Sequence, residues 1–278
     1  MKAIFDNVAI KTSKMTTRSY STSFSLGILL LNNSIRDAIY SIYGFVRFAD
    51  EIVDTFHDYD KEKLLNEFRI DTYKAINEGI SLNPILHSFQ WVVNKYNIDM
   101  ELIDTFLDSM EMDLQKRDYN QEEFEKYILG SAEVVGLMCL KVFCEGDKEQ
   151  YDNLKAPAMK LGSAFQKINF LRDLNADYQK LGRAYFPGID VENFDFATKK
   201  AVEADIEKDF NAGLEGIKKL PLNARFGVYI AYMYYYKLFQ KIKNTPHSKI
   251  MKERIRVPNA KKYSLILSSY FRYRLNII

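Results

Sequence analysis

Residues 42–56 read IYGFVRFADEIVDTF. Their apolar side chains recur at intervals of three and four residues, which is the period of one face of an α-helix. The apolar positions are Ile42, Phe45, Val46, Ala49, Ile52, Val53 and Phe56. The segment therefore predicts an amphipathic helix with one face packed into a core.

The same spacing recurs through most of the chain between its six prolines. Alternation of apolar and polar residues, which marks strands, is scarce, and no Asn-Gly or Asp-Gly pair signals a hairpin. There is no internal repeat, low-complexity tract or linker, so we expect a single all-α domain over residues 1–278. The expected helices cover residues 34–56, 61–78, 84–96, 99–115, 121–144, 149–179, 198–219, 222–244 and 261–274.

The composition is that of a folded globular protein. The 278 residues are 47% apolar and 27% charged, enough for a large core and unlike a disordered chain. The net charge of +2 argues against nucleic-acid binding. Two cysteines, Cys139 and Cys144, and three scattered histidines exclude a disulfide framework and a His/Cys metal site. This cysteine usage favours a reducing, cytoplasmic environment.

The C-terminal tail holds an excess of positive charge. From Lys249 onward, eight Lys or Arg residues accompany one acid, Glu253, so the tail carries +7 and the rest of the chain −5. The tail either forms a solvated terminal helix or binds the surface of a membrane that contains anionic lipid. The second interpretation predicts peripheral membrane contact. We expect no segment to span a bilayer, because the most apolar stretches, Leu26–Leu31 and Phe226–Tyr236, are shorter than the ~20 residues needed. Met1–Ile10 lacks a signal-peptide pattern.

Two aspartates of the amphipathic helix lie one turn apart. Asp50 and Asp54 are separated by about 40° around a helix axis, with Arg47 on the same flank. Like charges at this spacing repel by roughly a few tenths of a kcal/mol unless a cation lies between them. Acidic pairs are also common on solvated helix faces, so this pair alone does not distinguish a metal site from such a face.

A second polar row strengthens the metal interpretation. Gln166, Asn169, Asp173 and Asp177 fall on one strip of the helix expected at 149–179. Carboxylate and amide oxygens suit Mg²⁺, which keeps several waters and is often shared with substrate phosphates. Two such rows facing each other across a helical cavity would hold Mg²⁺ around a diphosphate and make it a good leaving group.

Arginines lie close to both rows. Arg47, Arg172 and Arg183 are suited to bidentate contacts with phosphate oxygens. Their alternative role is to neutralise the neighbouring acids.

These segments resemble the motifs of the squalene/phytoene synthase family of head-to-head prenyl synthases, over most of the chain. Arg47–Asp54 resembles its first Asp-rich motif, and Gln166–Asp177 resembles its second. The other similar segments are Ser23-Phe24, Tyr127 with Val135–Met138, Gly182–Pro187 and, less distinctively, Tyr235 with Arg254–Pro258.

The resemblance implies an all-α isoprenoid-synthase domain around a central cavity, with Mg²⁺, or Mn²⁺ in its place, bound by both motifs. In the family, C1 of one prenyl diphosphate joins the C2–C3 double bond of another to give a cyclopropylcarbinyl diphosphate. This intermediate ionises, and the reaction ends by proton loss, as in phytoene, or by hydride transfer from NADPH, as in squalene. The chain looks most like the bacterial carotenoid branch, which implies condensation of two geranylgeranyl diphosphates through prephytoene diphosphate to phytoene, without NADPH.

The resemblance also assigns residues to roles. The implied metal ligands are Asp50, Asp54, Asp173 and Asp177. The implied substrate-binding residues are Ser23, Phe24, Arg47, Gln166, Asn169, Arg172, Arg183 and Tyr235. The implied catalytic residues are Tyr127, Arg47, Arg172, Asp50 and Asp173, with Tyr127 either stabilising a cation by its ring or moving a proton by its hydroxyl. Two positions depart from the family pattern: Glu51 stands where many relatives have a second aspartate, and Ala176 stands where an acid commonly precedes the last aspartate. The Asp-x-x-x-Asp frames are intact.

Two other functions stay open. The first is a dehydrosqualene or squalene synthase that uses C15 substrates, because the chain length depends on the residues at the tunnel floor. The second is a non-catalytic helical assembly factor of the same fold, although a protein without metal chemistry has no reason to keep two repulsive acidic rows. A cyclase or a head-to-tail synthase is disfavoured, because the motif from Gln166 to Asp177 resembles the head-to-head group.

Overall fold

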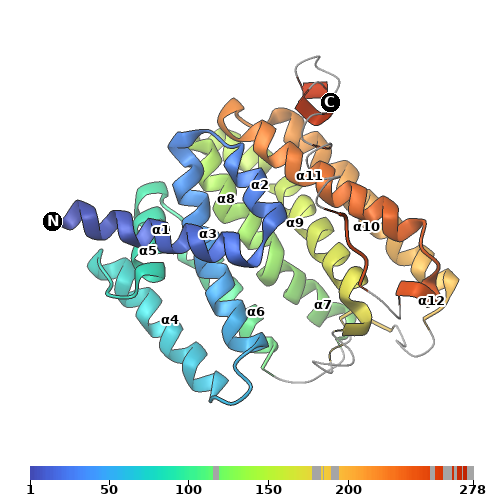
Figure 1. Cartoon of the computed structure of the whole chain (residues 1–278), viewed down its shortest axis with the longest axis horizontal. Helices are drawn as coiled ribbons and strands as arrows, with labels where there is room; N and C mark the ends of the chain where they lie inside the picture. Colours follow the sequence, from blue (N-terminus) through green and yellow to red (C-terminus); the bar gives the residue numbers. More distant parts are fainter. Residues whose placement is uncertain are drawn as a thin grey trace.

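The computed structural model describes residues 1–114, 119–176, 183, 185–188, 194–250 and 254–258, together with 265, 268–270 and 272–273. Every regular element in these ranges is helical, which confirms the all-α prediction (Figure 1). The elements are α1 (Lys2–Tyr20), α2 (Thr22–Leu29), α3 (Asn33–Asp54), α4 (Lys61–Glu78), α5 (Pro84–Tyr96), α6 (Met100–Met112), α7 (Gln121–Ile128), the π-helix η1 (Leu129–Glu133), α8 (Val134–Cys144), α9 (Lys148–Ala176), α10 (Phe196–Lys219), α11 (Leu222–Lys243) and α12 (His247–Ile250).

The helices predicted between residues 34 and 244 are confirmed, with ends that shift by a few residues. The predicted helix at 261–274 lies mostly outside the described residues. The sequence prediction missed α1, α2 and α12.

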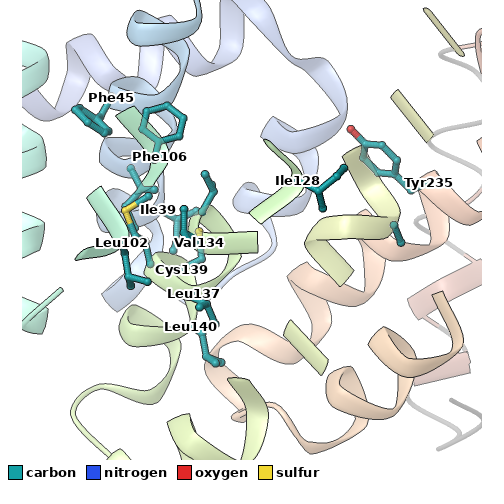
Figure 2. Close-up of a cluster of buried hydrophobic side chains, with 14 of the residues drawn as sticks. Ile39, Phe45, Leu102, Phe106, Ile128, Val134, Leu137, Cys139, Leu140 and Tyr235 are labelled. Atoms are coloured by element: carbon teal, nitrogen blue, oxygen red, sulfur yellow. The ribbon is translucent and has the colours of Figure 1, made fainter. Parts of the chain in front are cut away.

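Helix α3 lies in the core, as its apolar stripe predicts. Phe45 is fully buried and stacks on Phe89 of α5, with ring centroids 3.8 Å apart. Phe106 of α6 lies 5.5 Å from the same ring, and Figure 2 shows the two rings next to each other above Ile39. Burying a side chain of this size stabilises a fold by about 1.5–3 kcal/mol, so α3 anchors the helices that surround it.

Helix α1 crosses α3 and α5 at one side of the molecule (Figure 1). A Cβ atom at Gly44 would lie 2.7 Å from Ser13 Oγ, so α1 and α3 approach each other closely only because position 44 is glycine. Ser13 also forms a buried 2.7 Å hydrogen bond with Ser88 of α5. These contacts place the C-terminal end of α1 beside α3.

The α7, η1 and α8 segments form one continuous helix, Gln121–Cys144, that is long and apolar enough to cross a membrane. This corrects the expectation that no stretch of the chain reaches that length. In its most apolar window, 67% of the residues are buried inside the protein, as in the core helix of a globular fold. In the described part of the chain we therefore assign this helix to the core.

Helix α9 packs most extensively against α10 and α8. A Cβ atom at Gly216 of α10 would lie 2.6 Å from Cβ of Pro157 in α9, and one at Gly162 would lie 2.7 Å from the Ala132 carbonyl oxygen of η1. Helix α2 meets α11 in the same way, because a Cβ at Gly227 would lie 2.7 Å from the Gly27 carbonyl oxygen. These close approaches form the walls around a central cavity.

Candidate active site

A cavity of about 990 Å³ lies between α2, α3, α8, α9, α10 and α11. Its volume is at the upper end of the about 300–1,000 Å³ that is common for ligand pockets. Asp50 and Asp54 of α3 and Asp173 of α9 all belong to its wall, so the two acidic rows face the same space. The fourth predicted ligand, Asp177, lies outside the described residues.

The charged side chains of the described cavity wall are all aspartates and arginines. Each described aspartate is paired with an arginine, and the basic members outnumber the acidic ones. The basic wall residues are Arg47, Arg172, Arg254 and Arg256. Such a wall suits an anionic ligand that arrives with cations for the carboxylates.

In the first row, Arg47 donates hydrogen bonds to Asp50 and Glu51. The guanidinium also lies 4.4 Å from the ring centroid of Tyr20, at the end of α1. Burial, together with the nearby Asp54 carboxylate, raises the pKa of Asp50 to about 6, although Arg47 acts in the opposite direction. The charged form of Asp50 is therefore costly in this wall, and an added cation would stabilise it.

Asp54 is held by Arg183, whose Nη1 donates to Oδ1 of Asp54 at 2.8 Å. Arg183 is buried, 4% exposed, and is not part of the described cavity wall. Although burial opposes it, the charges of Asp113 and Asp54 raise the pKa of Arg183 above its usual value. In this structure, Arg183 orients a predicted metal ligand, while its predicted contact with diphosphate stays a prediction.

In the second row, two arginines hold Asp173. Arg172 donates to both carboxylate oxygens, at 3.0 and 2.5 Å. Arg254, from the segment 254–258, lies 2.7 and 2.9 Å from the same two oxygens. Asp173 thus joins α9 to the C-terminal part of the chain at the cavity wall.

The amides of the second row lie next to an aromatic wall. Gln166 and Asn169 line the cavity and share a 3.4 Å hydrogen bond, and Tyr235 Oη donates to Asn169 Oδ1 at 3.4 Å. The Tyr235 ring stacks on Phe165 at 4.1 Å and lies 5.6 Å from Phe24. Phe24, Gln166, Asn169 and Tyr235 are therefore all at the predicted site, whereas the side chain of Ser23 lies outside the described part of the structure.

Tyr127 lines the cavity from the end of α7, and its hydroxyl donates to Asp113 Oδ2 at 2.6 Å. Tyr185 Oη donates to the other oxygen of Asp113 at 3.2 Å. Burial raises the pKa of Asp113 to about 7, against the opposing effects of Arg183 and the Tyr127 hydroxyl. Burial also raises the pKa of Tyr127 well above its usual value, so the phenol is neutral at physiological pH.

Sequence analysis did not identify Asp113, Tyr20 or Arg254 as site residues. Asp113 follows α6 and belongs to no motif, and only the tertiary fold brings it to Tyr127. Tyr20 ends a helix that was not predicted. Arg254 carried a sequence signal, because it begins the Arg-Ile-Arg-Val-Pro segment that resembles the family.

The described residues fit a cation that is shared with a substrate. No three His, Cys, Asp or Glu side chains of the described chain gather as in a closed metal cage. The available donors are hard carboxylate oxygens from α3 and α9 on the wall of one cavity. Mg²⁺ commonly binds through one or two carboxylates and completes its shell with water and phosphate oxygens, so Asp50, Asp54 and Asp173 suit Mg²⁺ bound with a diphosphate.

Comparison with known proteins gives the family. The model of the family described as squalene/phytoene synthase matches residues 17–261, which contain both acidic rows and the Tyr127 helix. The chain belongs to the squalene/phytoene synthase family. It is therefore an all-helical relative of head-to-head prenyl synthases, in a family that binds prenyl diphosphates and typically depends on Mg²⁺.

Named relatives in this family are phytoene synthases at low identity. The chain is 25% identical to the phytoene synthase of Arthrospira platensis, over 94% of this chain and 92% of that protein. It is 24% identical to the 15-cis-phytoene synthase of Synechococcus elongatus, over 91% and 90%.

Solved structures of the family share the fold. The chain matches a dehydrosqualene synthase with a TM-score of 0.83 and 18% identity, over 97% of this chain and 98% of that one. It matches the squalene synthase HpnC of Alicyclobacillus acidocaldarius with a TM-score of 0.75 and 20% identity, over 86% and 95%. At these identities the likeness shows the isoprenoid-synthase fold and leaves the substrate open.

Proposed function

We propose that this protein is a phytoene synthase that condenses two geranylgeranyl diphosphates head to head, through prephytoene diphosphate, to phytoene in carotenoid biosynthesis. The observation that carries the proposal is the meeting of Asp50, Asp54 and Asp173 on the wall of one aromatic-lined cavity. Two relatives named phytoene synthase, which are 25% and 24% identical to this chain, support the C20 substrate.

The proposed site separates a polar region from an apolar one. Asp50, Asp54 and Asp173 hold Mg²⁺, which when bound stabilises the charge on the leaving diphosphate. Arg47 and Arg172 make bidentate contacts with the diphosphate oxygens. Gln166 and Asn169 fix its position through their amide groups.

The apolar region protects the carbocation that remains after the C–O bond breaks. Water would quench this cation, so the reaction needs a dry cavity. Phe24, Phe165 and Tyr235 form a packed aromatic wall beside the polar region. Tyr127 presents its ring to the same cavity, where an aromatic face attracts a cation. Proton loss to the released diphosphate ends the reaction and gives a conjugated triene without NADPH.

Product analysis tests the proposal. The purified protein is incubated with Mg²⁺ and either C15 or C20 prenyl diphosphate, with and without NADPH. We expect a C40 triene from the C20 substrate that forms equally well without NADPH. A C30 product alone would refute the chain length and identify a dehydrosqualene or squalene synthase. The absence of any product and of diphosphate binding would identify a non-catalytic member of the fold.

A further inference from the structure

Two tyrosine hydroxyls converge on one buried carboxylate beside the proposed site. Asp113 follows the last residue of α6 and is 5% exposed. Its Oδ2 accepts from Tyr127 at 2.6 Å, and its Oδ1 accepts from Tyr185 at 3.2 Å. Arg183 donates to the backbone carbonyl of Asp113 at 2.5 Å and lies 3.3 Å from Oδ1. The group therefore links Tyr127 to α6 by a short, buried hydrogen bond.

Packing fixes the two helices that carry this hydrogen bond. A Cβ atom at Gly130 would lie 2.5 Å from both the Thr105 carbonyl oxygen and Ser109 Cβ, so η1 rests directly on α6. Gly130 is one turn after Tyr127, and Ser109 is one turn before Asp113. The distance between the tyrosine and the carboxylate is thus set by a backbone contact rather than by flexible side chains.

A carboxylate suits this position for a chemical reason. The two hydroxyls approach different oxygens of Asp113, and a carboxylate accepts at both, whereas an asparagine amide would place a nitrogen that only donates opposite one of them. The Tyr127 ring is also confined, because the rings of Tyr119, Tyr185 and Phe170 lie 5.3, 5.1 and 5.8 Å away. The hydroxyl end is held by Asp113, and the ring remains at the cavity wall.

We propose that Asp113 is the positioning residue of Tyr127: it holds the phenol hydroxyl as a donor to the protein and thereby keeps the ring against the cavity. This inference rests on the proposed function, in which Tyr127 contacts the reacting carbons. A phenol that donates to an ionised carboxylate has a more electron-rich ring, which attracts a cation more strongly. The geometry thus assigns the ring of Tyr127, rather than its hydroxyl proton, to the carbocation.

A double-mutant cycle tests the inference. Asp113→Asn, Tyr127→Phe and the double variant are compared with wild type by circular dichroism, kcat and KM. We expect each single variant to lower kcat about tenfold or more with KM within about threefold. The double variant should be no worse than the poorer single variant by more than about twofold, because both changes remove one hydrogen bond.

Asp209→Asn is the matched control. Asp209 is also buried and ion-paired, to Lys167 at 2.6 Å, and accepts from Ser163 at 2.9 Å, but it is not part of the described cavity wall. We expect it to lose stability and to keep kcat within about twofold. A comparable loss of kcat in this control would mean that a missing buried charge, not the positioning of Tyr127, explains Asp113→Asn.

Other outcomes separate the inference from the proposed function. If Asp113→Asn lowers kcat by the same factor in the Tyr127→Phe background, Asp113 acts independently of Tyr127 and the positioning role is wrong. If wild type forms no product from either substrate, the proposed function fails instead. If Asp113→Asn does not fold, Asp113→Glu replaces it in the same cycle. Its longer side chain displaces both acceptor oxygens from the two tyrosine hydroxyls, so we expect the same coupling with Tyr127→Phe.

Discussion

Replacing Gly130 by alanine should destabilise the protein, because the new methyl group has no room. Its Cβ would lie 2.5 Å from the Thr105 carbonyl oxygen and from Ser109 Cβ. One of these neighbours is backbone, so η1 and α6 must move apart by nearly 1 Å to restore ordinary contact, which is about 3.4 Å or more. Overpacking of this kind costs about 1–3 kcal/mol, and a backbone clash belongs at the upper end.

The cost is partly offset, because alanine is better than glycine within a helix by roughly 0.5–1 kcal/mol. The net expectation is a loss of about 2–2.5 kcal/mol, which lowers Tm by roughly 4–10 °C at about 2–4 °C per kcal/mol. Differential scanning calorimetry measures the shift. Gly136→Ala in α8 is the control, because its Cβ would meet only the Ala158 carbonyl group, with the oxygen at 3.3 Å and the carbon at 3.9 Å, and we expect a smaller change.

The same substitution should lower activity, because it moves Tyr127 relative to Asp113. We expect kcat to fall more than the fraction of folded protein does at the assay temperature. A Gly130→Ala protein that melts at or above the wild-type temperature would show that the contact between η1 and α6 is looser than the structure indicates, and would refute the reasoning.

Three other predictions concern the cavity. Asp50→Asn and Asp173→Asn should each lower the Mg²⁺-dependent kcat by about 100-fold or more and retain the helical circular dichroism spectrum. The control Asp71→Asn, on the exposed face of α4, should not lower kcat in this way. Full turnover by a folded Asp173→Asn protein would refute the ligand assignment. Burial raises the pKa of Cys139 to about 12, so at pH 8 its thiolate population is about a thousandfold below that of a free thiol, and a disulfide reagent should modify it only after unfolding. Because the thiol ionises at lower pH in the unfolded chain, this group makes the protein less stable as pH rises above about 8.5. Fast modification of Cys139 in the native protein at pH 8 would contradict the burial. Tyr235→Phe keeps the stacked ring and should retain activity within about threefold, whereas Tyr235→Ala should lose at least about tenfold; equal losses would mean that the hydroxyl, not the ring, matters.

The acidic rows were predictable from sequence because each is a local pattern. Asp50 and Asp54 are one turn apart on a helix with a clear apolar stripe. Asn169 and Asp173 are likewise one turn apart on their helix. Helical geometry converts such spacing directly into a shared face. That the two rows face one cavity was a hypothesis from the residues, and the family resemblance implied it too; the described structure places Asp50, Asp54 and Asp173 on the wall of one cavity.

Asp113 was not predictable in this way. Nothing in its neighbourhood along the chain distinguishes it from other acids at helix ends, and its partners Tyr127, Arg183 and Tyr185 are separated from it in sequence. A role that depends on contacts between separate elements leaves no periodic signal.

Helices α1 and α2 were missed for a local reason. The first residue of α1 has no side-chain cap, and its buried face includes Ser13, Thr16 and Thr17, which do not stand out as apolar. Helix α2 spans Thr22–Leu29, too short for a clear period. Their positions are determined by close packing on α3 and α11 rather than by propensity.

The contact between Gly27 of α2 and Gly227 of α11 has a consequence for the newly synthesised chain. Gly27 lies in α2, which leaves the ribosome well before α11, the helix that carries Gly227. Until α11 emerges, the face of α2 that packs against it is uncovered and exposed to other nascent chains. The wall of the central cavity is therefore also a surface that a chaperone would need to shield during translation.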